Sequence, residues 1–75
     1  MEKLWSANEI GALIGISGST VKLWQDQKLI PEATRLGRLK KRVWGKYKVR
    51  LILEFARDIA GYPVPDRIFE QVKRS

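Results

Sequence analysis

The chain has 75 residues, with 15 Lys and Arg against 8 Asp and Glu, which gives a formal net charge of +7. It contains no Cys and no His, and this excludes a disulfide, a thiolate zinc site and a histidine general base. We expect one small domain that is not an enzyme and needs no cofactor. Its basic charge favours an anionic partner, with nucleic acid first.

The first predicted helix begins after Ser6. Ser6 and Glu9 have the spacing of a capping box, in which each side chain accepts a hydrogen bond from the backbone N–H of the other residue. Trp5 and Ile10 have the spacing of a hydrophobic staple across the same helix start. Gly15 is the residue that ends this helix.

The second predicted helix has Ser17 as its N-cap and ends before Pro31. Val21 and Trp24, three residues apart, form its apolar face. The opposite face presents Ser19, Lys22, Leu23 and Asp26. An apolar residue such as Leu23 on that face is either a tolerated exposed side chain or a contact for a thymine methyl group in a DNA groove.

A β-hairpin is predicted between residues 32 and 43. Gly37-Arg38 has the Gly-X form of a two-residue type II′ turn, and this turn would place Arg35 opposite Lys40. Two like charges in opposite positions destabilise a hairpin, whereas bound phosphates would relieve their repulsion. The basic residues of segment 33–53, which contains no acid, are Arg35, Arg38, Lys40, Lys41, Arg42, Lys46, Lys48 and Arg50.

A third helix is predicted over residues 46–60, and Gly61 ends it. Its expected core stripe is Val49, Ile52, Leu53, Ala56, Ile59 and Ala60. Lys46 and Lys48 lie in its first turn, where cations oppose the helix dipole, and a phosphate at this helix end would remove the conflict. A short last helix over residues 65–73 should dock on the domain through Ile68, Phe69 and Val72.

Four short motifs follow one another between residues 15 and 44. They are Gly15-Ile16-Ser17, then Thr20-Val21-Lys22-Leu23-Trp24 followed by Lys28-Leu29-Ile30-Pro31, and finally Arg42-Val43-Trp44. They resemble the Gly-Val-Ser, the Thr-Leu-Arg-Tyr-Tyr with Gly-Leu-Leu-x-Pro, and the Arg-x-Tyr of MerR-like winged helix-turn-helix regulators. Thr20-Val21, Trp24 and the basic Gly37-Arg38 turn also resemble excisionase-like DNA-binding domains.

The chain departs from the MerR-like pattern at several of these positions. Leu23 and Trp24 replace two tyrosines, Lys22 replaces an arginine, Lys28 replaces a glycine, and Pro31 comes one place early. No long coiled coil or effector domain follows the last predicted helix, so the resemblance gives no indication of an inducer or other small-molecule effector.

The resemblance implies a mostly α fold, a winged helix-turn-helix with three to four helices and a short two-stranded β wing. The single domain would span residues 1–75, with the helix-turn-helix at about 6–30, the wing at about 32–43 and the later helices at about 46–60 and 65–73. The second helix would enter the major groove of double-stranded DNA, while the wing and the start of the third helix contact backbone or minor groove. The implied DNA-binding residues are Ser17, Ser19, Thr20, Lys22, Leu23, Gln25, Arg35, Arg38, Lys40, Lys41, Arg42, Lys46 and Lys48.

Three functions remain open at this point. The first is a small MerR-like transcriptional regulator that binds duplex DNA sequence-specifically, in the cytoplasm and associated with the nucleoid. The second is an excisionase, or recombination directionality factor, that bends DNA; self-association or cooperative binding on DNA is compatible with either. The third is a basic protein–protein adaptor. RNA binding is less favoured because most aromatic residues occupy core-like positions, and no membrane partner is expected.

Overall fold

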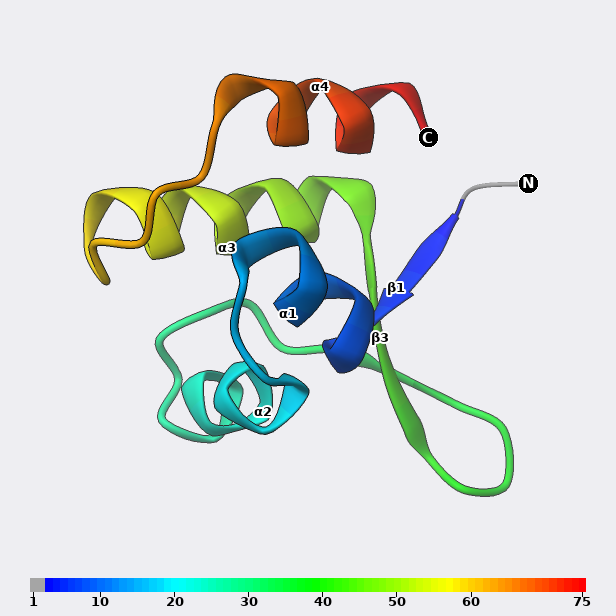
Figure 1. The fold of residues 1–75 in the computed structure, drawn as a ribbon. Helices are drawn as coiled ribbons and strands as arrows, with labels where there is room; N and C mark the ends of the chain where they lie inside the picture. The colour runs from blue at the N-terminus through cyan, green and yellow to red at the C-terminus, as the bar shows by residue number, and fades with distance from the viewer. Residues whose placement is uncertain (1–2) are drawn as a thin grey trace.

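The computed structural model describes residues 3–75, so the first two residues of the predicted domain lie outside it. Its elements are β1 (Leu4–Ser6), α1 (Ala7–Ile14), α2 (Gly18–Asp26), β2 (Thr34–Leu36), β3 (Lys41–Gly45), α3 (Lys46–Asp58) and α4 (Asp66–Arg74). Helix α1 lies between α2 and α3, and α4 packs along the other side of α3 (Figure 1). The β2–β3 hairpin extends away from the helices.

The sheet has three antiparallel strands in the order β1-β3-β2, where the sequence had predicted a two-stranded wing. The strand that was missed is β1, whose Trp5 pairs with Trp44 of β3. Only three residues long, β1 runs directly into the cap of α1, so it has no periodic pattern of its own. Because β1 pairs with β3, the N-terminal strand and the hairpin belong to one sheet.

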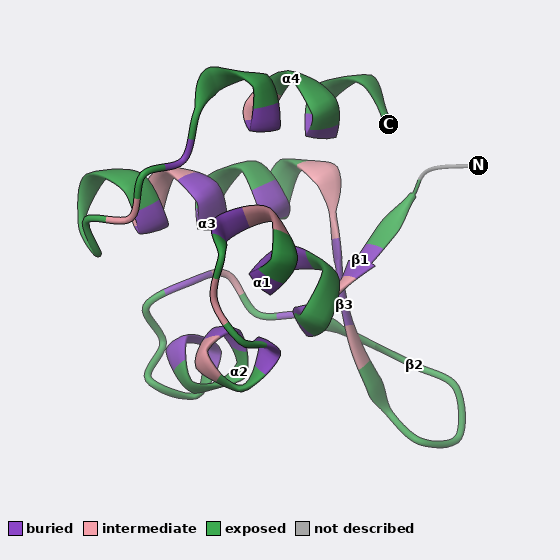
Figure 2. Cartoon of the chain, viewed as in Figure 1, coloured by how far each residue is buried: buried purple, intermediate pink, exposed green. Residues whose placement is uncertain are grey.

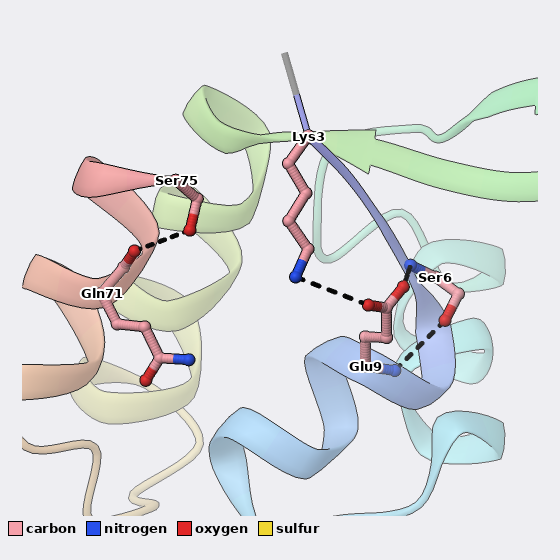
Figure 3. Close-up of polar contacts among 5 residues, drawn as sticks. All are labelled: Lys3, Ser6, Glu9, Gln71 and Ser75. Atoms are coloured by element: carbon pink, nitrogen blue, oxygen red, sulfur yellow. Dashed lines mark hydrogen bonds and ion pairs between the residues drawn. The ribbon is translucent and has the colours of Figure 1, made fainter. Parts of the chain in front are cut away.

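The predicted starts of the first two helices are confirmed. Ser6 Oγ accepts the Glu9 N–H at 3.2 Å, and Glu9 Oε1 accepts the Ser6 N–H at 3.0 Å, which completes the capping box (Figure 3). Gly15 ends α1 with a left-handed φ of 95°. Ser17 Oγ accepts the Thr20 N–H at 3.3 Å and caps α2. Both helices of the pair are therefore fixed by local side-chain chemistry.

One hydrophobic core joins all four helices and the sheet (Figure 2). Its largest fully buried side chain is Trp44, whose Nε1–H donates to the Pro31 carbonyl oxygen at 2.8 Å. This bond satisfies the one polar atom of the indole inside the core and fixes the loop after α2 to β3. Within the same core, the Trp24 ring meets the Phe55 ring edge-on, with centroids 5.1 Å apart.

The third helix ends at Asp58, two residues before the predicted end. Ile59 was expected in the core stripe, but it lies beyond the helix and is 74% exposed. Gly61 has a φ of 81° and turns the chain, and the Tyr62 N–H then donates to the Ala56 carbonyl oxygen at 2.8 Å. The predicted fourth helix is present, and its Ile68 and Val72 are buried against α3.

The hairpin turn is longer than the two-residue turn that was predicted. Leu36 pairs with Lys41, so residues 37–40 form the connection, and Arg35 lies opposite Arg42 rather than Lys40. The Lys40 N–H donates to the Gly37 carbonyl oxygen at 3.2 Å. Gly37 and Lys40 both have positive φ, 73° and 53°. A four-residue connection of this kind sets the register, and two like charges still lie opposite each other, now Arg35 and Arg42.

Candidate nucleic-acid interface

The exposed face of α2 is the one that the sequence predicted. Ser19, Lys22, Leu23 and Asp26 are all exposed, whereas Val21 and Trp24 are buried in the core. Leu23 is 52% exposed. This face therefore presents a cation, a hydroxyl and an apolar side chain side by side, which are groups that can contact base edges and thymine methyls.

The two other hydroxyls predicted for the interface are engaged at the start of α2. Ser17 Oγ caps the helix and lies 3.1 Å from Thr20 Oγ1, and Thr20 is half-buried. Their first role is to fix where α2 begins. Ser17 remains exposed, so it can still meet a neighbouring anion at this helix end.

Gln25 was predicted to be near the bases, but the structure buries it. It is only 9% exposed, because its position four residues after Val21 places it on the core side of α2. Among the described residues its Oε1 has no hydrogen-bond partner. The i+4 spacing from Val21 was visible in the sequence and would have assigned Gln25 to the buried face.

Cationic side chains line the whole hairpin. Every residue of β2 is exposed, and so is every residue of the connection 37–40. The exposed cations here are Arg35, Arg38, Lys40 and Lys41. Arg35 also donates from Nη1 to the Lys40 carbonyl oxygen at 3.4 Å, which holds its guanidinium close to the turn.

A groove of about 320 Å³ lies between the start of α1, the exposed face of α2 and the hairpin. Its lining brings Lys22 of α2 together with cations of the hairpin, although they are far apart in sequence. The lining residues are Ser6, Ala7, Asn8, Lys22, Arg35, Leu39, Lys40, Lys41 and Arg42. We call this basic groove together with the exposed faces of α2 and the hairpin the α2–hairpin surface.

Arg42 is a structural link within the α2–hairpin surface rather than a free cation. Its Nη1 lies 3.1 Å from Asp26 Oδ1 and donates to the Lys22 carbonyl oxygen at 3.4 Å. The Arg42 side chain is 20% exposed, compared with 59% for the carboxylate of Asp26. Its charge is largely used to attach β3 to α2.

Lys46 and Lys48 are separated from the other predicted contact residues. They begin α3, at the end of β3 opposite the hairpin turn. Lys48 Nζ donates to the Glu32 carbonyl oxygen at 2.8 Å, and Lys46 lines a second groove together with α4 residues such as Phe69. The prediction that the start of this helix joins the wing in gripping one DNA segment is not supported by this placement.

Four residues that line the groove were not among the predicted contacts: Ser6, Ala7, Asn8 and Leu39. Asn8 lies in the first turn of α1 and lines the groove, and Leu39 lies in the hairpin connection. A position in the first turn of a capped helix was a signal for Asn8. Leu39 was missed because the predicted two-residue turn placed it in a strand rather than in the connection of the hairpin.

Comparison of the chain with known protein families, with curated proteins and with solved structures gave no match. Within residues 3–75 there is no helix long and apolar enough to cross a membrane. The same part of the chain contains no cluster of acidic side chains suited to a metal ion.

Proposed function

We propose that this chain is a winged helix-turn-helix protein that binds duplex DNA sequence-specifically and acts as a small transcriptional regulator. The observation that carries the proposal is the α2–hairpin surface. Lys22 on the exposed face of α2 and the cations of the hairpin meet around one groove. One helix face and one basic arm on the same side of a domain can contact bases and phosphates of a single DNA segment.

The two parts of the surface have different chemistry, and this supports different roles. The α2 face mixes Ser19, Lys22 and Leu23, groups that discriminate among base edges. The hairpin offers mainly cations on flexible side chains, which suit phosphates of any sequence. Helix α2 would therefore read the major groove while the hairpin grips the backbone or the adjacent minor groove.

Salt dependence is the first test of this function. Lys22, Arg35, Arg38, Lys40 and Lys41 are exposed on the surface. About four phosphate contacts from these residues predict that log affinity falls against log salt with a slope of about −4. Fluorescence anisotropy with a duplex selected from a random-sequence pool measures the slope. A slope near zero, or binding to an acidic protein that excess DNA does not compete away, would contradict the proposal.

A matched pair of variants locates the contact. Lys41→Ala removes a cation of the α2–hairpin surface, whereas Lys73→Ala removes an exposed cation of α4, at the second groove. We expect Lys41→Ala to make the slope less negative by about 1 and Lys73→Ala to leave it unchanged. Equal effects of the two substitutions would show that only the net charge matters.

A further inference from the structure

Leu39 is the most solvent-exposed large hydrophobic side chain among the described residues. It is 93% exposed, while the others in this group range from 42% for Leu4 to 76% for Tyr47. Single exposed apolar residues are common on protein surfaces, so exposure alone indicates little. The position of Leu39 in the fold is what distinguishes it from the rest.

The hairpin holds Leu39 at its tip, away from the core. The arm between β2 and β3 projects beyond the helices, and almost all of it is exposed (Figure 1, Figure 2). Leu39 stands between Arg38 and Lys40, both exposed. Its side chain thus forms the apolar end of a mainly cationic arm, and no neighbour within residues 3–75 covers it.

The backbone of the tip is also unusual. Lys40, the residue after Leu39, has a φ of 53°, a left-handed conformation that non-glycine residues seldom adopt. The turn hydrogen bond from the Lys40 N–H to the Gly37 carbonyl oxygen closes the loop around Arg38 and Leu39. Here the conformation presents Leu39 at the tip.

We propose that Leu39 enters the minor groove and inserts between two base pairs, partly unstacking them and kinking the duplex. This inference rests on the proposed DNA-binding function and adds a deformation of DNA to it. Proteins that kink DNA from the minor groove use apolar side chains, including Leu, as the wedge, and cations next to the wedge hold the phosphates on each side. Arg38 and Lys40 flank Leu39 in that arrangement.

The rest of the α2–hairpin surface favours DNA over an anionic lipid surface as the partner of Leu39. Leu39 and Lys22 line the same groove, so the hairpin tip and the exposed face of α2 serve one partner. A single Leu offers little apolar area for membrane insertion, and stable anchoring needs more than one such signal. A base step, in contrast, accommodates one wedge side chain.

The experiment measures duplex deformation and binding in parallel. The duplex is one selected by the full chain from a random-sequence pool. Permanganate oxidises thymines that have become unstacked, so it shows which thymines of the duplex are exposed. Energy transfer between dyes on the two ends of the duplex measures bending. We expect the unsubstituted protein to raise permanganate reactivity several-fold at one step beside its footprint and to kink the duplex by roughly 20–90°.

Three variants identify the wedge. Leu39→Ala should reduce the permanganate signal to that of free DNA while reducing affinity far less than ten-fold, because the flanking cations remain. Leu39→Met keeps an apolar wedge and should retain the signal. Leu51→Ala, at an exposed leucine of α3 away from this surface, should behave like the unsubstituted protein.

The outcomes separate the two proposals. Binding without unstacking, or full unstacking by Leu39→Ala, overturns the wedge while leaving DNA binding intact. A protein that binds no duplex overturns both. Binding to vesicles that contain phosphatidylserine tests the lipid alternative. If the unsubstituted protein binds these vesicles and Leu39→Ala does not, while both proteins bind and unstack DNA equally, Leu39 contacts a membrane instead.

Discussion

Arg42 of β3 and Asp26 of α2 form an ion pair, with 3.1 Å between Nη1 and Oδ1, that links the hairpin to the helix beside it. The same guanidinium donates to the Lys22 carbonyl oxygen at 3.4 Å. Since Lys22 is the central cation of the exposed α2 face, this link sets how the hairpin lies relative to the residues that would meet base edges. A basic residue of the hairpin thus serves to orient the surface.

The first prediction concerns this ion pair. A double-mutant cycle with Arg42→Ala and Asp26→Ala should give a coupling free energy of about 0.5–1 kcal/mol, because one partner is mostly covered while the other is exposed. Urea unfolding followed by tryptophan fluorescence measures it. A coupling below about 0.2 kcal/mol would mean that the pair forms without orienting the hairpin.

The second prediction separates reading from gripping. If Lys22 touches a base edge, Lys22→Ala should reduce affinity for the selected site by about 1–3 kcal/mol and matter much less on scrambled DNA. Arg38→Ala should weaken both DNAs by similar factors, because a phosphate contact carries no sequence information. Binding curves for the two variants on the two duplexes decide between these roles. Equal losses on both duplexes for Lys22→Ala would make α2 a backbone clamp.

The third prediction follows from the burial of Gln25. Its Oε1 is buried without a hydrogen-bond partner among the described residues, so an apolar side chain of similar volume should suit the site better. Gln25→Met should raise the free energy of unfolding by about 1 kcal/mol. It should leave DNA affinity unchanged, because the side chain faces the core. A loss of base preference in this variant would restore Gln25 to the interface.

The sequence predicts the local features of this fold well and the long-range ones poorly. The caps at Ser6 and Ser17 and the glycine stop at Gly15 depend on residues within one turn, so their chemistry is visible in the sequence. The short strand β1 forms only because β3, far along the chain, pairs with it.

In the candidate surface too, the local features were predicted from the sequence and the long-range ones were not. The exposed face of α2 followed from helical spacing, and the basic hairpin followed from composition. That Arg42 would be taken up by Asp26, and that Lys46 would lie in a groove with α4, depends on tertiary packing. Charge counted along a sequence does not show which cations remain free after folding.

The fourth prediction concerns pH. The pKa of Glu9 is lowered below its ordinary value of 4.5, chiefly by the hydrogen bond from the Ser6 backbone N–H (Figure 3). Partial desolvation opposes this shift, while the Ser6 hydroxyl and the charges of Lys3 and Lys41 add to it. A carboxyl group with a lower pKa in the folded state stabilises the fold above its unfolded pKa. This contribution is lost as the pH falls through the folded value.

Thermal melts between pH 6 and pH 2.5 should therefore show a loss of stability below about pH 4.5 to which Glu9 contributes. Glu9→Gln keeps an acceptor for the Ser6 N–H but cannot titrate, so its curve should fall less steeply over this interval. Glu70→Gln, at an exposed carboxyl of α4, is the matched control and should follow the unsubstituted protein. Identical curves for all three proteins would show that the capping box does not depend on the charge of Glu9.

The fifth prediction concerns the close approach between α1 and the connection to α2. Gly11 is buried in α1, and its carbonyl oxygen accepts the Ile16 N–H at 2.9 Å. A Cβ at this position would lie 2.5 Å from the Ile16 carbonyl oxygen and 3.1 Å from the Ser17 carbonyl carbon. Both are backbone atoms that cannot rotate away, so the connection itself would have to shift.

Alanine in place of glycine inside a helix normally stabilises it by roughly 0.5–1 kcal/mol. Here the steric conflict should dominate, and Gly11→Ala should destabilise the domain by about 1–3 kcal/mol, as overpacked cores do. Gly45→Ser is the matched control, since Gly45 caps α3 at a φ of −76° and a Cβ added there would meet no atom within 4 Å. A serine there supplies the missing side-chain cap and should stabilise by a few tenths of a kcal/mol. Urea unfolding of both variants checks the opposite signs, and a gain in stability for Gly11→Ala would show that the α1–α2 connection moves freely.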